Sequence, residues 1–230
     1  MVDTLLLFDI DGTLIKESRE VTASYLKAVR SCLGIETGCD HMSTSGKTDF
    51  LIFKEILKGA GVDITKITYP DLIEEYLVHL ERSLEKNPGD ILSGVRPLLD
   101  LLAGHDHIRL ALGTGNIERG ARIKLSAHSL EGYFEVGGFG SDAVERPRII
   151  AAGIAKAQKH FRSRFRCIAV VGDTPFDIEA ARENGVHSIA VATGPFDPRT
   201  LARQRPSVLL EDLTETEAFL SGVLRISGGG

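Results

Sequence analysis

A short apolar segment near the start of the chain ends abruptly at two acidic residues. Residues Thr4–Phe8 have the apolar character of a buried strand, and Asp9 and Asp11 follow directly in the sequence DIDGT. Burying a carboxylate is costly unless another group pairs with it. In an open parallel sheet, however, ligands bind at the carboxyl ends of the strands. The two acids therefore indicate a cation site, a nucleophile or both, the alternative being polar turn residues that only end the strand.

The rest of the sequence alternates short apolar strands with amphipathic helices from residue 91 onward. This alternation predicts an α/β fold, a Rossmann-like parallel sheet with helices on both faces. The expected strands are Thr4–Phe8, Ile108–Leu112, Ile168–Val171, Ser188–Ala192 and Val208–Leu210. The expected helices are Arg96–Ala103, Ile117–Ser129, Arg148–Phe161, Phe176–Asn184 and Glu215–Val223. Thr214 and Glu217 have the spacing of a capping box for the last of these helices.

Residues 16–90 have a different pattern, with apolar residues at helical spacing and no convincing strand. We therefore predict two domains, an α/β core of residues 1–15 and 91–230 and an all-helical insert of residues 16–90. The expected hinges are Ile15–Ser18 and Asn87–Gly94, and the second contains the proline and glycines that suit a bend.

Composition excludes several classes of function. The 230 residues carry a net charge of −5 with no long basic run, so nucleic acid is not an expected partner. Cys32, Cys39 and Cys167 are too few and too irregularly spaced for a disulfide framework or a zinc site. The first apolar segment is interrupted by Asp9, so we expect neither a signal peptide nor a membrane span. A cytoplasmic protein, monomeric or homodimeric, fits these features.

Two further polar motifs follow predicted strands, GTGN at 113–116 and GDTPFD at 172–177. Together with DIDGTL at 9–14 they resemble signatures of the haloacid dehalogenase-like hydrolase superfamily, in its phosphatase branch. The arrangement is similar to that of phosphoglycolate phosphatase-like members, which carry a helical cap after the first strand. The third signature of that family is a lysine before a helix, and here Arg146 stands in the sequence ERP.

The resemblance implies a role for each acid. Asp9 would be the nucleophile that forms an aspartyl-phosphate, and Asp11 the general acid and then the base. The metal would be Mg²⁺, held by Asp9, the main-chain carbonyl of Asp11, and Asp173, with Asp177 close by or reaching the ion through water. On its own, Asp177 also suits the first turn of a helix, where an acid is favourable.

The remaining candidates would bind the substrate. Thr114, Gly115 and Asn116 would hold phosphoryl oxygens at a helix start, although Thr114 or Asn116 could equally be an ordinary helix cap. Arg146 would supply the cation, with Arg148 as a second candidate, Lys124 as a possible replacement and a solvated surface charge as the alternative. Lys47, in the insert, is a candidate contact for the part of the substrate beyond its phosphate.

These observations predict a Mg²⁺-dependent phosphatase that hydrolyses a small phosphorylated metabolite through an aspartyl-phosphate. A phosphomutase or a phosphonatase of the same superfamily is the alternative, and the phosphonatase would need a cap lysine such as Lys47 or Lys54. A 2-haloacid dehalogenase fits less well because Asp11 and Asp173 are present. A non-catalytic phosphate binder also fits less well, because Asp9, Asp11 and Asp173 are all intact. His105 and His107 are expected to be surface residues rather than a metal pair.

Overall fold

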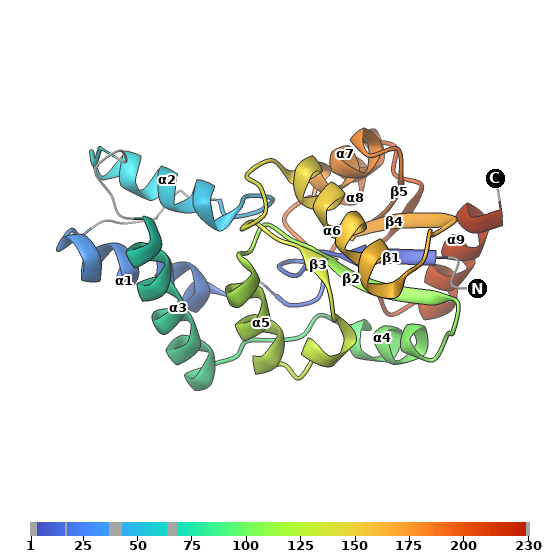
Figure 1. The fold of residues 1–230 in the computed structure, drawn as a ribbon, viewed down its shortest axis with the longest axis horizontal. Helices are drawn as coiled ribbons and strands as arrows, with labels where there is room; N and C mark the ends of the chain where they lie inside the picture. The colour runs from blue at the N-terminus through green and yellow to red at the C-terminus, as the bar shows by residue number, and fades with distance from the viewer. Residues whose placement is uncertain (1–3, 17, 37–42, 64–68, 229–230) are drawn as a thin grey trace.

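The protein forms an α/β domain with a group of helices packed against one end of it (Figure 1). The structure, a computed structural model, describes residues 4–16, 18–36, 43–63 and 69–228. Both ends of the chain lie at the far side of the α/β domain from the helical group (Figure 1). The carboxyl ends of the central strands therefore face the helical group.

The α/β domain contains a six-stranded, entirely parallel sheet in the order β3-β2-β1-β4-β5-β6. This is the order of doubly wound folds, in which the strand order reverses beside the first strand. The predicted fold class is confirmed. The strands are β1 (Thr4–Phe8), β2 (Ile108–Gly113), β3 (Gly137–Gly138), β4 (Cys167–Gly172), β5 (His187–Val191) and β6 (Val208–Leu210). The short strand β3 was not predicted because two glycines give no apolar pattern.

Helices cover both faces of the sheet, and the alternation of side chains in β1 shows how. Leu6 and Phe8 pack in one cluster with α4, α5 and α9, while Leu5 and Leu7 point to the opposite face, toward α6. All four side chains are fully buried. The helices of this domain are α4 (Val95–Ala103), α5 (Glu118–Ala127), α6 (Arg146–Phe161), α7 (Pro175–Glu183), α8 (Pro198–Arg203) and α9 (Thr216–Gly228), with a 3₁₀ turn at Glu131–Tyr133.

Within the described part of residues 16–90, three helices form the insert, which we call the cap. They are α1 (Arg19–Leu33), α2 (Asp49–Gly59) and α3 (Tyr69–Lys86). Their apolar faces meet in a separate cluster around Tyr25, Phe53 and Tyr76. Ile117, at the start of α5, also packs into this cluster. The cap core therefore includes a residue from the α/β domain, and α3 lies beside α5 (Figure 1).

The two connections between cap and α/β domain run side by side. Ile15 pairs with Ile91 in an antiparallel bridge. The Lys16 N–H donates to the Asp90 carbonyl at 2.9 Å, and the Leu92 N–H donates to the Leu14 carbonyl at 3.0 Å. The predicted hinge segments thus support each other through main-chain hydrogen bonds.

Several smaller expectations can be compared with the structure. The predicted capping box at Thr214 is wrong, because its hydroxyl donates to Asp212 and the helix begins at Thr216. Cys32 is exposed and Cys167 is buried, and Cys39 lies outside the described residues. Among the described residues, no helix has the length and apolar character needed to cross a bilayer.

Candidate active site

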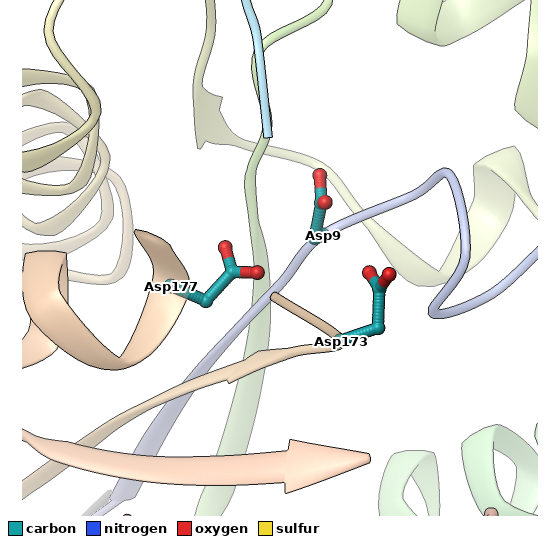
Figure 2. Close-up of side chains that lie close together, drawn as sticks. All are labelled: Asp9, Asp173 and Asp177. Atoms are coloured by element: carbon teal, nitrogen blue, oxygen red, sulfur yellow. The ribbon is translucent and has the colours of Figure 1, made fainter. Parts of the chain in front are cut away.

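The carboxyl ends of the three central strands bring the predicted polar motifs together. Asp9 follows β1, Thr114 follows β2 and Asp173 follows β4, and β1 pairs with both of the other strands. Because the three strands are parallel and in register, residues directly after them meet at one edge of the sheet. Asp177 joins them from the first turn of α7 (Figure 2).

Three of these acids form a compact buried cluster. One carboxylate oxygen from each of Asp9, Asp173 and Asp177 lies within 4.8 Å of the others, and the three side chains lie close together (Figure 2). Burial raises the pKa of Asp9 to about 6, an effect opposed by Arg146 and increased by Asp177 and Asp11. Burial, with Asp177 and Asp9, also holds the pKa of Asp173 well above its usual range. The cluster therefore favours the binding of a cation or of protons.

Arg146 is the cation that faces this cluster. It begins α6, and its Nη2 atom lies 2.9 Å from Asp9 Oδ2 and 2.6 Å from Asp177 Oδ1. Burial opposes the charged form, but Asp177 and Asp9 outweigh it and raise the pKa of Arg146, so it stays charged. Arg148 instead has an exposed side chain near Glu145. The interpretation of Arg146 as a solvated surface charge is therefore wrong.

Asp177 is both a helix cap and a neighbour of the acids. Its carboxylate accepts hydrogen bonds from the Thr174 main-chain N–H and hydroxyl, while the Thr174 hydroxyl accepts from the Asp177 N–H. This is a capping box at the start of α7. Asp177 Oδ1 remains turned to Arg146 at 2.6 Å. The helix-start interpretation and the functional one are thus compatible.

Asp11 has its own partners on the other side of the site. Its Oδ2 atom accepts hydrogen bonds from Asn116 Nδ2 at 2.8 Å and from Lys124 Nζ at 2.7 Å. Lys124 also donates to Asn116 Oδ1 at 2.7 Å, and its side chain is only 2% exposed. The three side chains form a closed triangle that holds the Asp11 carboxylate in place. Lys124 therefore supplements Arg146 rather than replacing it.

Thr114 is buried beside this triangle with both of its acceptor positions used. Its Oγ1 atom accepts from the Asn116 side chain at 2.8 Å and from the Asn116 main-chain N–H at 3.3 Å. A hydroxyl has one donor and two acceptor positions, so the hydroxyl hydrogen of Thr114 is left to donate to a further acceptor. The Asn116 N–H, expected to bind phosphate, is directed to Thr114 in this arrangement.

Glycines allow the turns around Asp173 to approach closely. A Cβ atom on Gly12 or Gly194 would collide with the Asp173 carboxylate, and Gly12 also has a φ of 81°. The Thr13 hydroxyl donates to Asp173 Oδ1 at 2.9 Å. The turn after Asp9 and the turn after β5 thus enclose Asp173 from two sides.

A cavity of about 190 Å³ lies over these residues, between the sheet edge and the cap. Asp9, Asp11, Thr114, Arg146 and other core residues line one side of it. The cap lines the other side with Tyr25, Asp49 and the residues 44–47. Lys47 belongs to this wall, but its Nζ atom lies 2.6 Å from Glu55. His105 and His107 are exposed, and neither is among the residues that line the cavity.

Sequence reasoning missed Asp49 and the hydroxyl group of Tyr25. Asp49 is 2% exposed, and Tyr25 donates to its Oδ1 atom at 2.5 Å. In the sequence, Tyr25 only contributes to the helical spacing of apolar residues within 16–90, which gives no sign of a role for its hydroxyl. The signal that was available is the acid at the start of a predicted helix in GKTD, at 46–49, although nothing in the sequence shows that it becomes buried against α5.

The donor set fits a hard divalent cation. Carboxylate oxygens are the ligands that Mg²⁺ prefers, and Asp9, Asp173 and Asp177 present three of them, with Arg146 as their facing cation. Burial first, and then the neighbouring carboxylates, raise the pKa of Asp9 and of Asp173, so a bound cation would favour their charged forms.

Comparison with known proteins agrees with this site. A family model described as haloacid dehalogenase-like hydrolase matches residues 6–191. The probable phosphatase IndB of Dickeya dadantii is 27% identical over 225 residues, which cover 97% of this chain and 96% of that protein. A candidate pyrophosphatase, PpaX of Caldanaerobacter subterraneus, is 24% identical over 95% of both chains.

A solved structure shows the same fold. CbbY from Rhodobacter sphaeroides, determined in complex with phosphate, superposes with a TM-score of 0.75 and covers 97% of this chain and 99% of its own. The sequence identity is 18%. The likeness extends over the sheet domain and the cap together.

Proposed function

Because the chain belongs to the haloacid dehalogenase-like hydrolase family and is a phosphate-ester hydrolase, we propose that it is a Mg²⁺-dependent phosphatase of a small phosphorylated metabolite. The reaction proceeds through an aspartyl-phosphate on Asp9. The observation that carries the proposal is the buried carboxylate of Asp9, 2.9 Å from the Arg146 guanidinium and at the base of the cavity. A small substrate matches the cavity of about 190 Å³.

In the first step an Asp9 carboxylate oxygen attacks phosphorus and the ester P–O bond breaks. The leaving alkoxide takes a proton from Asp11, which lines the same cavity. In the second step Asp11 accepts a proton from water as the water oxygen attacks phosphorus, and inorganic phosphate leaves Asp9. The ion pair between Asp11 and Lys124 corresponds to the ionised form that this second step requires.

Charge on the phosphoryl oxygens needs preorganised donors. Arg146 Nε is buried and has no hydrogen-bond partner among the described residues, so it is available to an anion. The hydroxyl of Thr114 has a hydrogen to donate in the same cavity, and Gly115 lies beside it. These groups bind and orient the phosphoryl group between Asp9 and Asp11.

Asp9, Asp173 and the main-chain carbonyl of Asp11 would hold Mg²⁺, with Asp177 beside them. When bound, the ion neutralises charge among the carboxylates and the phosphoryl oxygens. Asp177 also holds Arg146 in place at 2.6 Å. We propose that the protein works in the cytoplasm as a monomer or homodimer.

The test is phosphate release from p-nitrophenyl phosphate and a panel of sugar and organic-acid phosphates. Turnover with Mg²⁺ is expected to disappear with EDTA and to fall by at least about 10⁴-fold in Asp9→Asn. Asp106→Asn, an exposed acid outside the cavity, is the matched control and retains full activity. No release from any phosphate by a folded protein would contradict the proposal and favour the mutase, phosphonatase or binder.

A further inference from the structure

Helix α5 begins directly after the loop of Thr114–Asn116, and its first residues lack a cap of their own. The residue at the N-cap position is Ile117, whose side chain offers no acceptor. The first N–H groups of a helix have no partner within the helix and need one from elsewhere. The orientation of this helix start determines where the loop before it lies.

Within the α/β domain, the Ser141 hydroxyl accepts from the Glu118 N–H at 3.3 Å. The acceptor for the Ile117 N–H comes from the cap. Asp49 Oδ2 accepts a hydrogen bond from the Ile117 N–H at 2.7 Å, although Asp49 is the first residue of α2. The Asp49 N–H in turn donates to the Gly115 carbonyl at 3.1 Å. One cap residue therefore binds the main chain of the loop on both sides of Asn116. A carboxylate that accepts from a helix N-terminus is a charge-assisted cap.

The Asp49 carboxylate is held in this position by the other two cap helices. Tyr25, from α1, donates its hydroxyl to Asp49 Oδ1 at 2.5 Å, and Tyr76, from α3, donates to the Tyr25 hydroxyl at 3.0 Å. The Tyr25 and Tyr76 rings stack with centroids 4.2 Å apart. All three side chains are buried. The position of Asp49 thus depends on the packing of the whole cap.

The cap loop that leads to Asp49 approaches the α/β domain closely at two points beside the cavity. A Cβ atom on Gly115 would collide with the Lys47 carbonyl, and a Cβ atom on Gly46 would collide with the Phe176 ring. Residues 46–49 therefore lie between the loop after β2 and the start of α7. The hydrogen bonds of Asp49 across the boundary belong to this closed arrangement.

We propose that Asp49 is a positioning residue that couples cap closure to the phosphate-binding loop. Asp49 of the cap accepts a hydrogen bond at the start of α5 from across the domain boundary. The loop Thr114–Asn116 therefore takes its phosphate-binding geometry only when the cap is packed against the α/β domain. The inference goes beyond the proposed function, and only its kinetic test depends on that function.

The test compares Asp49→Ala with Asp49→Asn, which keeps an acceptor oxygen for Ile117, and with Tyr25→Phe, which keeps the stacked ring. Hydrogen exchange is measured on a peptide that spans residues 113–118, and the binding of inorganic phosphate is measured by calorimetry. In Asp49→Ala we expect faster exchange at Ile117 and roughly tenfold weaker phosphate binding, consistent with the loss of a charged cap. In Asp49→Asn we expect exchange and phosphate binding close to those of wild type. In Tyr25→Phe both values should lie between those of Asp49→Asn and Asp49→Ala.

In steady-state assays Asp49→Ala should raise KM and the inhibition constant of phosphate together, with kcat changed less. Unchanged exchange and phosphate binding in a folded Asp49→Ala would overturn the inference. Should that variant fail to fold, Tyr25→Phe carries the test, because it removes the hydroxyl that holds Asp49 Oδ1 and keeps the stacked ring; smaller losses in the same direction are expected, and unchanged exchange and phosphate binding would overturn the inference. Exchange and phosphate binding need no turnover, so an inactive wild type would contradict the proposed function while leaving this test intact.

Discussion

The sheet edge and the cap loop contribute to one cavity, but they are built by different kinds of interaction. At the sheet edge, Asp9, Thr114 and Asp173 are brought together by the in-register pairing of parallel strands. In the cap loop, Asp49 reaches the same cavity through hydrogen bonds to a helix of the other domain. The first arrangement follows from local sequence and strand topology, whereas the second exists only when two domains pack together.

The comparison predicts that charge changes at the sheet edge have the largest effects. In Arg146→Met, Asp9 and Asp177 lose their shared buried cation. We expect kcat/KM to fall by about 10²–10³-fold and the unfolding free energy to fall by about 3–5 kcal/mol, as measured by steady-state kinetics and urea denaturation. Arg148→Met, an exposed arginine on the same helix, is the control. Equal losses of kcat/KM and of unfolding free energy in Arg146→Met and Arg148→Met would contradict the role of Arg146 as the buried cation of the acid cluster.

A substitution of Lys124 tests whether the hydrogen-bonded triangle of Asp11, Asn116 and Lys124 takes part in catalysis. Lys124→Met keeps the side-chain length but removes the donor to Asp11 and Asn116. We expect kcat to fall by about 10²-fold with an alkyl phosphate, because a poor leaving group needs a well-placed general acid. The loss with p-nitrophenyl phosphate should be smaller, because its leaving group needs little protonation. The same loss with both substrates would show that Lys124 does not act through Asp11.

The acid cluster predicts an unusual dependence of stability on pH. The pKa of Asp9 is about 6 in the folded protein against 3.8 for the ordinary side chain. Between these values the folded state binds more protons than the unfolded state, so stability falls as the pH rises through this window. With EDTA present, the unfolding free energy of wild type relative to Asp9→Asn should fall by about 3 kcal/mol between pH 3.5 and pH 7. A flat or rising difference would contradict a raised pKa of Asp9 in the folded protein.

The sheet edge was also the part of the site that the sequence predicted. Apolar strands that end in DIDGT, GTGN and GDTPFD are recognisable locally, and their parallel pairing then dictates that the polar residues meet. The position of Arg146 at a helix start was predicted too, but its burial between Asp9 and Asp177 was not. That burial depends on where α6 packs, which periodicity does not determine.

In the cap, by contrast, the contacts that contribute to the site could not be predicted from the sequence. The helical spacing of apolar residues predicted an all-helical insert, and α1, α2 and α3 each bury an apolar face. It could not show that Tyr25 has its ring in the cap core and its hydroxyl on Asp49. It also could not show that Ile117 of α5 completes the cap core. These contacts link residues far apart in the sequence, and no local pattern records them.

The most direct test of the account is to capture the phosphoryl group on Asp9. The Asp11→Asn variant lacks both the acid for the first step and the base for the second, so it is mixed with Mg²⁺ and p-nitrophenyl phosphate, whose leaving group needs little protonation. The mixture is quenched in acid and digested for mass spectrometry. The account predicts that the peptide containing Asp9 gains the mass of one phosphoryl group, and that Asp9→Asn gains none. Phosphate release by wild type with no phosphorylated Asp9 in the quenched variant would contradict it and indicate direct attack by water.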